Sequence, residues 1–365
     1  MDLAGEIKKW RADIHSDGYP MSIGELISLY QNNELDIHPE FQRLYRWTDT
    51  QKSRLIESLL LGIPIPSIFV SQRNDGVWDV IDGVQRLSTI FQTIGILKDE
   101  REKLVPPLVL TKTKYLPSLE GRTWEGKKSL GSEHQLLIKR SKIDIKIILR
   151  ESSEASKYEL FQRLNSGGSL LSDQEMRNVV LIMVSPPFYR WLMKLSRDEN
   201  FNQCAALSDQ ALLEQYHVEL AVRFLVFRNR SDKNLRGIGD IGDFLTEQIV
   251  ALAESKQFHK SKEELIFKNT FAVLAESLGD DSFRKFDSNR DNYAGGFSIS
   301  AFEVLAIGLG YHMGKDGLRP DPTQIVAVSK QLWNDPMFTK SSGSGVRASS
   351  RIPVIIPYGR KLLSQ

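Results

Sequence analysis

The sequence has almost no cysteine, and this absence limits the chemistry that the protein can perform. A single cysteine, Cys204, stands among 365 residues, so an intramolecular disulfide and a cysteine-rich zinc site are both excluded. The segment FNQCAAL places no cationic residue beside the thiol. Since a reactive thiolate needs a nearby positive charge, we expect Cys204 to be a buried, inert, small apolar residue.

Long apolar runs are also missing. No segment approaches the roughly 20 consecutive apolar residues of a membrane-spanning helix. The start of the chain, MDLAGEIKKWRADIHSDGYP, lacks the apolar core of a secretory signal peptide. The sequence therefore predicts a cytoplasmic protein with no membrane partner.

Histidine is scarce, and the histidines are scattered. They stand at positions 15, 38, 134, 217, 259 and 312, with no pair at metal-ligating spacing. None of them lies in an Asp-His-x-x-Pro context. We therefore predict no metal-ligating side chains in this chain.

The net charge of +2 is close to zero, so binding to nucleic acid cannot be argued from the total. Cations do gather locally in three clusters: Lys139, Arg140 and Lys142; Arg228 and Arg230; and Arg347, Arg351, Arg360 and Lys361. Each cluster is consistent with a solvated face or with a stripe that contacts phosphates. The sequence leaves both interpretations open.

The helix and strand patterns divide the chain into two parts. Residues 1–170 predict a small mixed-sheet domain of the α/β or α+β class, and residues 171–365 predict a mostly α-helical domain. The first part shows strand patterns over residues 63–72, 77–82 and 142–150, and helix patterns over residues 21–31, 49–61, 84–97 and 153–165. The second part shows helix patterns near residues 172–184, 187–196, 208–228, 241–257, 261–279, 298–313 and 322–335. Near the end, RIPVIIP at residues 351–357 predicts a strand, and the composition of residues 341–350 predicts a flexible loop.

Capping residues support the helix assignments. Ser22 with Glu25, and Ser172 with Glu175, have the spacing of a capping box. Thr48 can cap the helix that begins at residue 49, and Gly62 stands where a C-cap glycine belongs. Arg54 and Glu57 lie one turn apart on that helix, where a surface pair is the simplest interpretation.

The stretch VIDGVQRLSTI, residues 80–90, predicts a strand that enters a helix through Gly83. Backbone N–H groups at such a junction, together with the helix dipole, form an anion site. Arg86 offers a guanidinium fork for phosphate oxygens, and Gln85 offers an amide donor. Asp82 either caps the helix, or holds a cation or orients Arg86. On these residues alone, an ordinary surface arginine remains the alternative.

Two further segments resemble parts of a phosphate site. HPEFQRLYRW supplies Gln42 and Arg43 among aromatic residues, a combination that suits a nucleotide, although Phe41 and Trp47 could equally pack inward. FQRLNSGG places Asn165 before two glycines, as in a helix C-cap, but an asparagine can also position metal-bound phosphate.

Together these segments resemble the N-terminal domain of GmrSD-type modification-dependent restriction enzymes, over roughly residues 20–180. The family pattern resembles P-x-F-Q-R-x-Y-x-W, then S-R-L-I-E-S-L-L-x-G-x-P-I-P, then D-G-Q-Q-R-L, then F-x-x-L-N-x-G-G-x-x-L-S-x-Q-E-x-R-N. The matching residues are Pro39, Phe41, Gln42, Arg43, Tyr45 and Trp47; Ser53 through Leu60, Gly62, Pro64, Ile65 and Pro66; Asp82, Gly83, Gln85, Arg86 and Leu87; and Phe161, Leu164, Asn165, Gly167, Gly168, Leu171, Ser172, Gln174, Glu175, Arg177 and Asn178.

The resemblance implies a fold similar to ParB and sulfiredoxin, and an Mg²⁺-dependent nucleoside triphosphatase in bacterial anti-phage defence. It implies that Asp82, Gln85 and Arg86 form the catalytic core of the nucleotide site. Gly83, the pair Gln42 and Arg43, and Asn165 would also bind the nucleotide. Relatives couple nucleotide turnover to DNA cleavage by an HNH-type nuclease domain. No such domain is evident here, so the resemblance implies a separate nuclease or defence-system subunit as partner, with DNA as a further partner.

One departure from the pattern keeps a second function open. Val84 stands where the family most often has glutamine, and a residue without a hydrogen-bonding group could weaken hydrolysis or could simply face the core. The alternatives to a nucleoside triphosphatase are therefore a nucleotide-binding switch without turnover, and a ParB-like DNA-binding or nuclease module.

Overall fold

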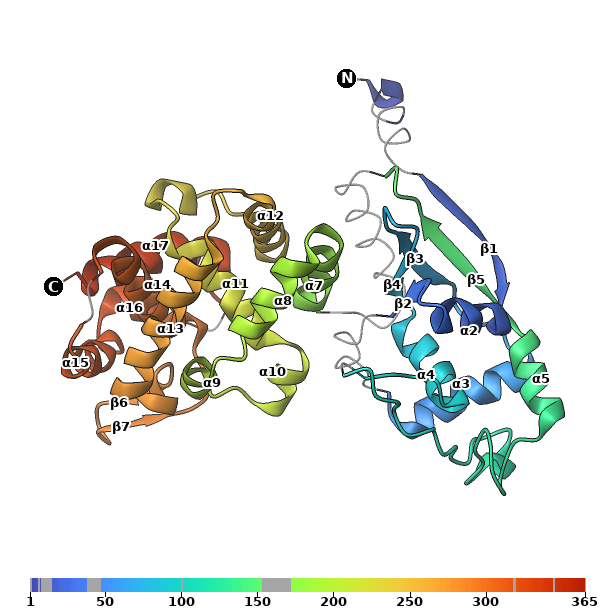
Figure 1. The fold of residues 1–365 in the computed structure, drawn as a ribbon. Helices are drawn as coiled ribbons and strands as arrows, with labels where there is room; N and C mark the ends of the chain where they lie inside the picture. Colours follow the sequence, from blue (N-terminus) through green and yellow to red (C-terminus); the bar gives the residue numbers. More distant parts are fainter. Residues whose placement is uncertain are drawn as a thin grey trace. The chain divides into compact units, whose positions relative to one another are not determined.

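The computed structural model describes residues 2–5, 7, 15–37, 47–99, 101–152, 172–317, 320–343 and 345–364. The chain divides into two compact units, residues 1–170 and residues 171–365. Each unit has its own fold (Figure 1).

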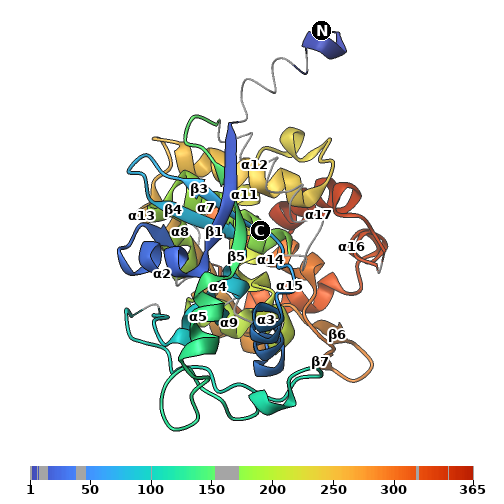
Figure 2. The ribbon, with the colours of Figure 1, turned by 90° about the vertical axis from the view of Figure 1, so that its right-hand side faces the viewer.

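Unit 1 is built on a five-stranded mixed sheet with the strand order β1-β5-β3-β4-β2. The strands are β1 (Ser16–Ser22), β2 (Leu35–Asp36), β3 (Ile68–Gln72), β4 (Trp78–Asp82) and β5 (Lys142–Ile148). β3 and β4 form the predicted antiparallel hairpin, whereas β3 with β5 and β2 with β4 are parallel. The edge strand β1, paired antiparallel with β5 (Figure 2), was not predicted.

In the described part of unit 1, the α-helices are α2 (Ile23–Gln31), α3 (Asp49–Leu61), α4 (Val84–Ile94) and α5 (Ser132–Arg140). Ser22 caps α2 by accepting a hydrogen bond from Glu25 N–H, but the described residues do not form the reciprocal bond of the predicted capping box. The cap residues of α3 act as the sequence predicts. Thr48 forms a capping box with Gln51 at the start of α3, and Gly62 ends that helix at φ +69°. The core between the helices and the sheet is fully buried at Ile56, Ile68 and Phe91.

The surface interpretation of Glu57 is wrong. Glu57 is buried, and its Oε1 accepts hydrogen bonds from the backbone N–H groups of Tyr115 and Leu116 at 2.8 and 2.9 Å. One turn earlier on α3, the Ser53 hydroxyl accepts a bond from Thr111 N–H at 2.9 Å. These two side chains hold the segment between α4 and α5, which is largely irregular and therefore depends on such partners for its backbone donors.

Unit 2 is mostly helical, as predicted. Its longer helices are α7 (Asp173–Val184), α8 (Pro186–Leu195), α11 (Tyr216–Arg228), α12 (Ile241–Glu254), α13 (Lys260–Ser277), α14 (Ile299–Asp316), α15 (Pro322–Leu332) and α17 (Ala348–Leu362). Shorter elements connect them: α9 (Glu199–Ala205), α10 (Asp209–Leu213), α16 (Pro336–Ser341) and the hairpin of β6 (Lys285–Asp287) with β7 (Asn292–Ala294). Ser172 and Glu175 form the predicted capping box of α7.

Two predictions for the end of the chain are wrong. RIPVIIP is not a strand but lies inside α17, and residues 348–350 of the predicted loop form the first turn of this helix. The buried residues Ile352, Ile355 and Ile356 have helical spacing and pack α17 against α14. This burial outweighs the cost of the two prolines that the helix contains.

The expectation for the cysteine is met. Cys204 is buried, and this burial raises the pKa of its thiol to about 12. Among the described residues, no helix has the length and apolar character that are needed to cross a bilayer.

Candidate functional site

The β4–α4 junction brings four of the predicted site residues together. Asp82 ends β4, Gly83 is the N-cap of α4, and Gln85 and Arg86 lie in the first turn of that helix. The arrangement follows from the sequence, because an apolar strand ends at Asp82-Gly83 and residues of helical period begin directly afterwards.

Gly83 is required at this junction for two independent reasons. Its φ of +104° lies in the region that favours glycine. A Cβ at this position would also lie 2.7 Å from Cγ1 of Ile68, the first residue of β3. The glycine therefore lets α4 start in close contact with the hairpin that carries Asp82.

Arg86 is held firmly by its surroundings. Its Nη2 lies 2.6 Å from Oδ2 of Asp82, and its Nη1 donates to the carbonyl oxygens of Pro66 and Ser67, the latter at 2.9 Å. The Arg86 side chain is only 12% exposed, whereas that of Asp82 is 50% exposed. Of the alternatives for Asp82, the structure supports its pairing with Arg86.

Asp82 does not cap α4. The helix begins at Val84 after the N-cap Gly83, and within the described residues no side chain caps it. The first backbone N–H groups of an α-helix have no acceptor within the helix, and the dipole makes this end partly positive. The start of α4 can therefore accept an anion, and Arg86 adds a positive charge at the same place.

Val84 is half-buried and packs against the hydrophobic core of unit 1. The core-facing alternative for this position is therefore the correct one. The effect of this valine on hydrolysis stays a prediction. Gln85, the next residue, is also half-buried.

Gln42, Arg43 and Asn165 lie outside the described residues. The pairing of β2 with β4 nevertheless bears on the prediction for Gln42 and Arg43. β2 and β4 are parallel, with Asp36 beside Asp79, so the chain leaves both strands in the same direction. In the sequence, Gln42 and Arg43 come after β2, whereas Asp82 is the last residue of β4 and Gly83 comes next. That the two pairs meet around one ligand stays a prediction.

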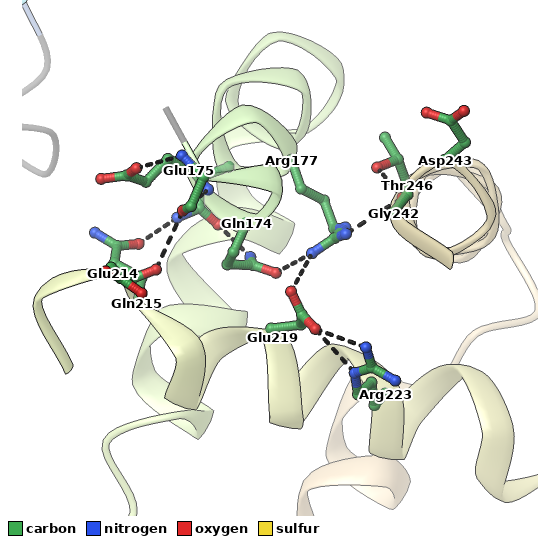
Figure 3. Close-up of polar contacts among 12 residues, drawn as sticks. Gln174, Glu175, Arg177, Glu214, Gln215, Glu219, Arg223, Gly242, Asp243 and Thr246 are labelled. Atoms are coloured by element: carbon green, nitrogen blue, oxygen red, sulfur yellow. Dashed lines mark hydrogen bonds and ion pairs between the residues drawn. The ribbon is translucent and has the colours of Figure 1, made fainter. Parts of the chain in front are cut away.

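The residues Gln174 to Asn178, which match the last block of the pattern, form a buried polar network within unit 2 (Figure 3). Arg177 is fully buried; it donates to Gln174 Oε1 and to the carbonyl oxygen of Gly242, and lies 3.8 Å from Glu219. The ion pairs continue from Glu219 through Arg223 to Glu303 and Arg351. These matched residues thus stabilise unit 2, a role that the sequence did not reveal because their partners are distant along the chain.

The sequence left two interpretations open for the basic clusters of unit 2, a solvated face and a stripe that contacts phosphates. Three arginines of these clusters fit neither. Arg228, Arg351 and Arg360 are buried and not on a solvated or phosphate-contacting face. Arg228 pairs with Glu263, Arg351 with Glu303, and Arg360 with Asp232. Each of these three arginines is thus paired with a carboxylate of unit 2 and does not form part of an exposed basic stripe.

A separate cavity of about 580 Å³ lies beside β2 and the end of α2. Arg73 lines it and bonds to Asp36 at 2.6 Å and to Asp79. Burial lowers the pKa of Arg73, but the hydrogen bonds and charges of Asp79 and Asp36 outweigh this effect and raise it. None of the junction residues lines this cavity, so the cavity and the predicted site are different places in unit 1.

No metal centre is preformed among the described residues: they contain no group of three or more His, Cys, Asp or Glu side chains that could hold an ion. A metal ion at the junction would therefore need oxygen ligands from a bound phosphate or from water beside the exposed carboxylate of Asp82.

Comparison with known families finds a match in the first part of the chain. Residues 23–182 match the family described as "GmrSD restriction endonuclease, N-terminal domain". The resemblance found in the sequence is thereby confirmed, and the match runs from the start of α2 into α7. No curated protein and no solved structure matches the chain.

Proposed function

We propose that the chain binds and hydrolyses a nucleoside triphosphate at the β4–α4 junction, and that this turnover controls DNA restriction in defence against phage. The family match supports the role in restriction. The observation that carries the nucleotide site is the junction itself. A helix start without a side-chain cap lies beside an arginine that two backbone carbonyls and a carboxylate hold in place.

The junction supplies the interactions that phosphoryl transfer requires. Backbone N–H groups at the start of α4 would bind phosphate oxygens, and Arg86 would offset the charge that develops on the transferred group. Within the described residues, Arg86 forms three hydrogen bonds, two through Nη1 and one through Nη2. A guanidinium has five N–H donors, so the N–H groups outside these bonds would donate to a ligand. Gln42 and Arg43 would supply a second phosphate-binding pair, and Asn165 a third element.

Mg²⁺ is the expected cofactor, and the donor set fits it. Mg²⁺ binds proteins through one or two carboxylates while phosphate and water supply its other ligands. Asp82 offers one carboxylate that is half exposed. The ion would supply further neutralisation of phosphate charge. In this proposal DNA cleavage belongs to a separate nuclease subunit.

The test is phosphate release from ATP, GTP, CTP and UTP with Mg²⁺, with and without DNA. Arg86→Ala and Asp82→Ala should lower the rate about 100-fold or more. The first variant removes a positive charge at the reacting phosphates, and the second removes the carboxylate that holds Arg86 and would bind Mg²⁺. Arg101→Ala, an exposed arginine of unit 1, is the matched control and should keep the wild-type rate.

Three other outcomes would replace the proposal. Tight nucleotide binding without phosphate release would make the protein a nucleotide-dependent switch. Release that survives in both junction variants would move the chemistry elsewhere. Absence of nucleotide binding, combined with salt-dependent DNA binding, would favour a DNA-binding module.

A further inference from the structure

A shallow apolar groove of about 610 Å³ lies between the end of α3 and one face of α5, in unit 1. Leu60, Leu61 and Gly62 line one side, and Leu136 and Leu137 line the other. The two helices pack against each other, so the groove is part of one folded surface (Figure 1).

Three leucines of the groove are largely exposed. Leu61, Leu136 and Leu137 are 45%, 45% and 46% exposed. Contiguous exposed leucines cost free energy in water and are typical of surfaces that bind a partner. The site is far in the sequence from the β4–α4 junction and shares no residue with it.

Two charged residues frame the leucines on α5. Glu133 stands one turn before them, and Arg140 one turn after them. Positions 133, 136, 137 and 140 recur at helical spacing, so these four side chains share one face. No ion pair within the described residues engages Glu133 or Arg140, and both are exposed. Both charges are therefore available to a partner.

This face is complementary to itself. The midpoint between Glu133 and Arg140 is also the midpoint between Leu136 and Leu137. A two-fold axis through that point would place Glu133 of each copy beside Arg140 of the other, and Leu136 beside Leu137. A two-fold interface uses the same patch on both subunits, so it requires this kind of pattern.

We propose that a second copy of this chain docks on the groove, with the two α5 helices antiparallel. The leucines at the centre would lose their contact with water, and the two Glu133–Arg140 pairs would fix the antiparallel orientation. One helix pair with the adjoining end of α3 makes a small interface, so the dimer should dissociate on dilution at micromolar concentrations, on the order of 10 µM. The proposal is independent of nucleotide chemistry.

Charge reversal tests the orientation directly, by sedimentation of the full-length chain across a concentration series. Glu133→Arg alone, or Arg140→Glu alone, would turn both opposite-charge contacts into like-charge contacts and should weaken the dimer about tenfold or more. An equal mixture of these two variants should restore dimerisation, because each mixed pair contains only opposite charges. Lys139→Glu reverses a charge on α5 outside the groove and is the matched control.

The leucines supply a second test. Leu136→Asp with Leu137→Asp should abolish the dimer, and circular dichroism should show that these exposed positions leave the fold intact. A wild-type chain that stays monomeric up to about 500 µM would overturn the proposal. A dimer that both single charge reversals leave unchanged, or that the mixture fails to restore, would overturn it as well.

Discussion

At the scale of the residue, Gly83 is the most constrained position of the candidate site. Gly83→Ala would combine strain at φ +104° with a contact of 2.7 Å to Ile68. We expect a loss of about 2–4 kcal/mol in the free energy of unfolding. Gly76→Ala is the matched control, because Gly76 has a φ of +89° but nothing within 4 Å of a Cβ. It should lose only about 1 kcal/mol. Urea denaturation measures both, and equal losses would contradict the packing argument.

The buried carboxylate of Glu57 makes the stability of the protein depend on pH. Burial alone would raise the pKa of Glu57, but hydrogen bonds from Thr113 and from the N–H groups of Tyr115 and Leu116 outweigh it and lower the pKa. A lowered pKa in the folded state means that the stabilisation is present above the ordinary pKa of 4.5 and is lost as pH falls through the folded value.

Glu57→Gln should therefore destabilise the protein clearly at neutral pH and much less in acid. The measurement is the urea midpoint of the variant and wild type at about pH 7 and about pH 3.5. Glu125→Gln controls for the loss of one negative charge at an exposed position. A stability difference that stays constant between these pH values would show that the ionised form of Glu57 is not what holds the segment.

At the scale of the element, α17 shows packing outweighing local preference. Pro353 and Pro357 lie inside this helix and cannot donate backbone hydrogen bonds. Pro353 is only half-buried, so its ring contributes less packing than the neighbouring isoleucines. Pro353→Ala should raise the free energy of unfolding by about 1 kcal/mol, since the gain in helix propensity exceeds the lost restriction of the unfolded chain. Thermal denaturation tests this, and a lower melting temperature would show that packing against α14 requires the proline.

The elements differ in how far the sequence could predict them. α3 and α7 were predictable because Thr48 and Ser172 mark their starts with local hydrogen bonds. β1 was not, since SDGYPMS contains Gly18 and Pro20, and its extended state depends on pairing with a strand more than 100 residues later. The prediction for α17 was wrong because its structure also depends on distant contacts. RIPVIIP is rich in β-branched residues, and only its contacts with α14 make it helical.

The candidate site divides in a similar way. The strand–glycine–helix junction and the i,i+4 spacing of Asp82 and Arg86 are local, so the sequence predicted that these residues would lie together. The carbonyl partners of Arg86, at Pro66 and Ser67, precede it by 20 and 19 residues in the sequence. These hydrogen bonds form only because α4 packs beside the start of β3. The burial of Arg177, Arg228 and Arg351 was equally hidden, because a sequence shows the charge of an arginine but not its distant partner.

At the scale of the whole molecule, the two units have separate cores, and unit 2 depends on its buried ion pairs. Glu303 on α14 is fully buried and contacts both Arg223 of α11 and Arg351 of α17. Glu303→Ala would leave buried arginines without this partner, at a cost of about 3–5 kcal/mol. Asp280→Ala removes an exposed pair with Arg284 and should cost less than about 1 kcal/mol.

Calorimetry can show whether the units unfold separately. We expect two transitions, of which Glu303→Ala lowers one and Gly83→Ala lowers the other, since each substitution lies within a different core. If both variants lowered the same transition by similar amounts, the two units would unfold as one cooperative body.

The hydrogen bonds from Arg86 to the carbonyl oxygens of Pro66 and Ser67 have an evolutionary consequence. If the guanidinium also binds a ligand, then a shift of the backbone at Pro66 and Ser67 changes the direction in which Arg86 points. Selection on the site would then act on a segment whose side chains do not contact the ligand. In related chains, substitutions in that segment should therefore appear together with compensating changes at Arg86 or its neighbours, rather than independently of them.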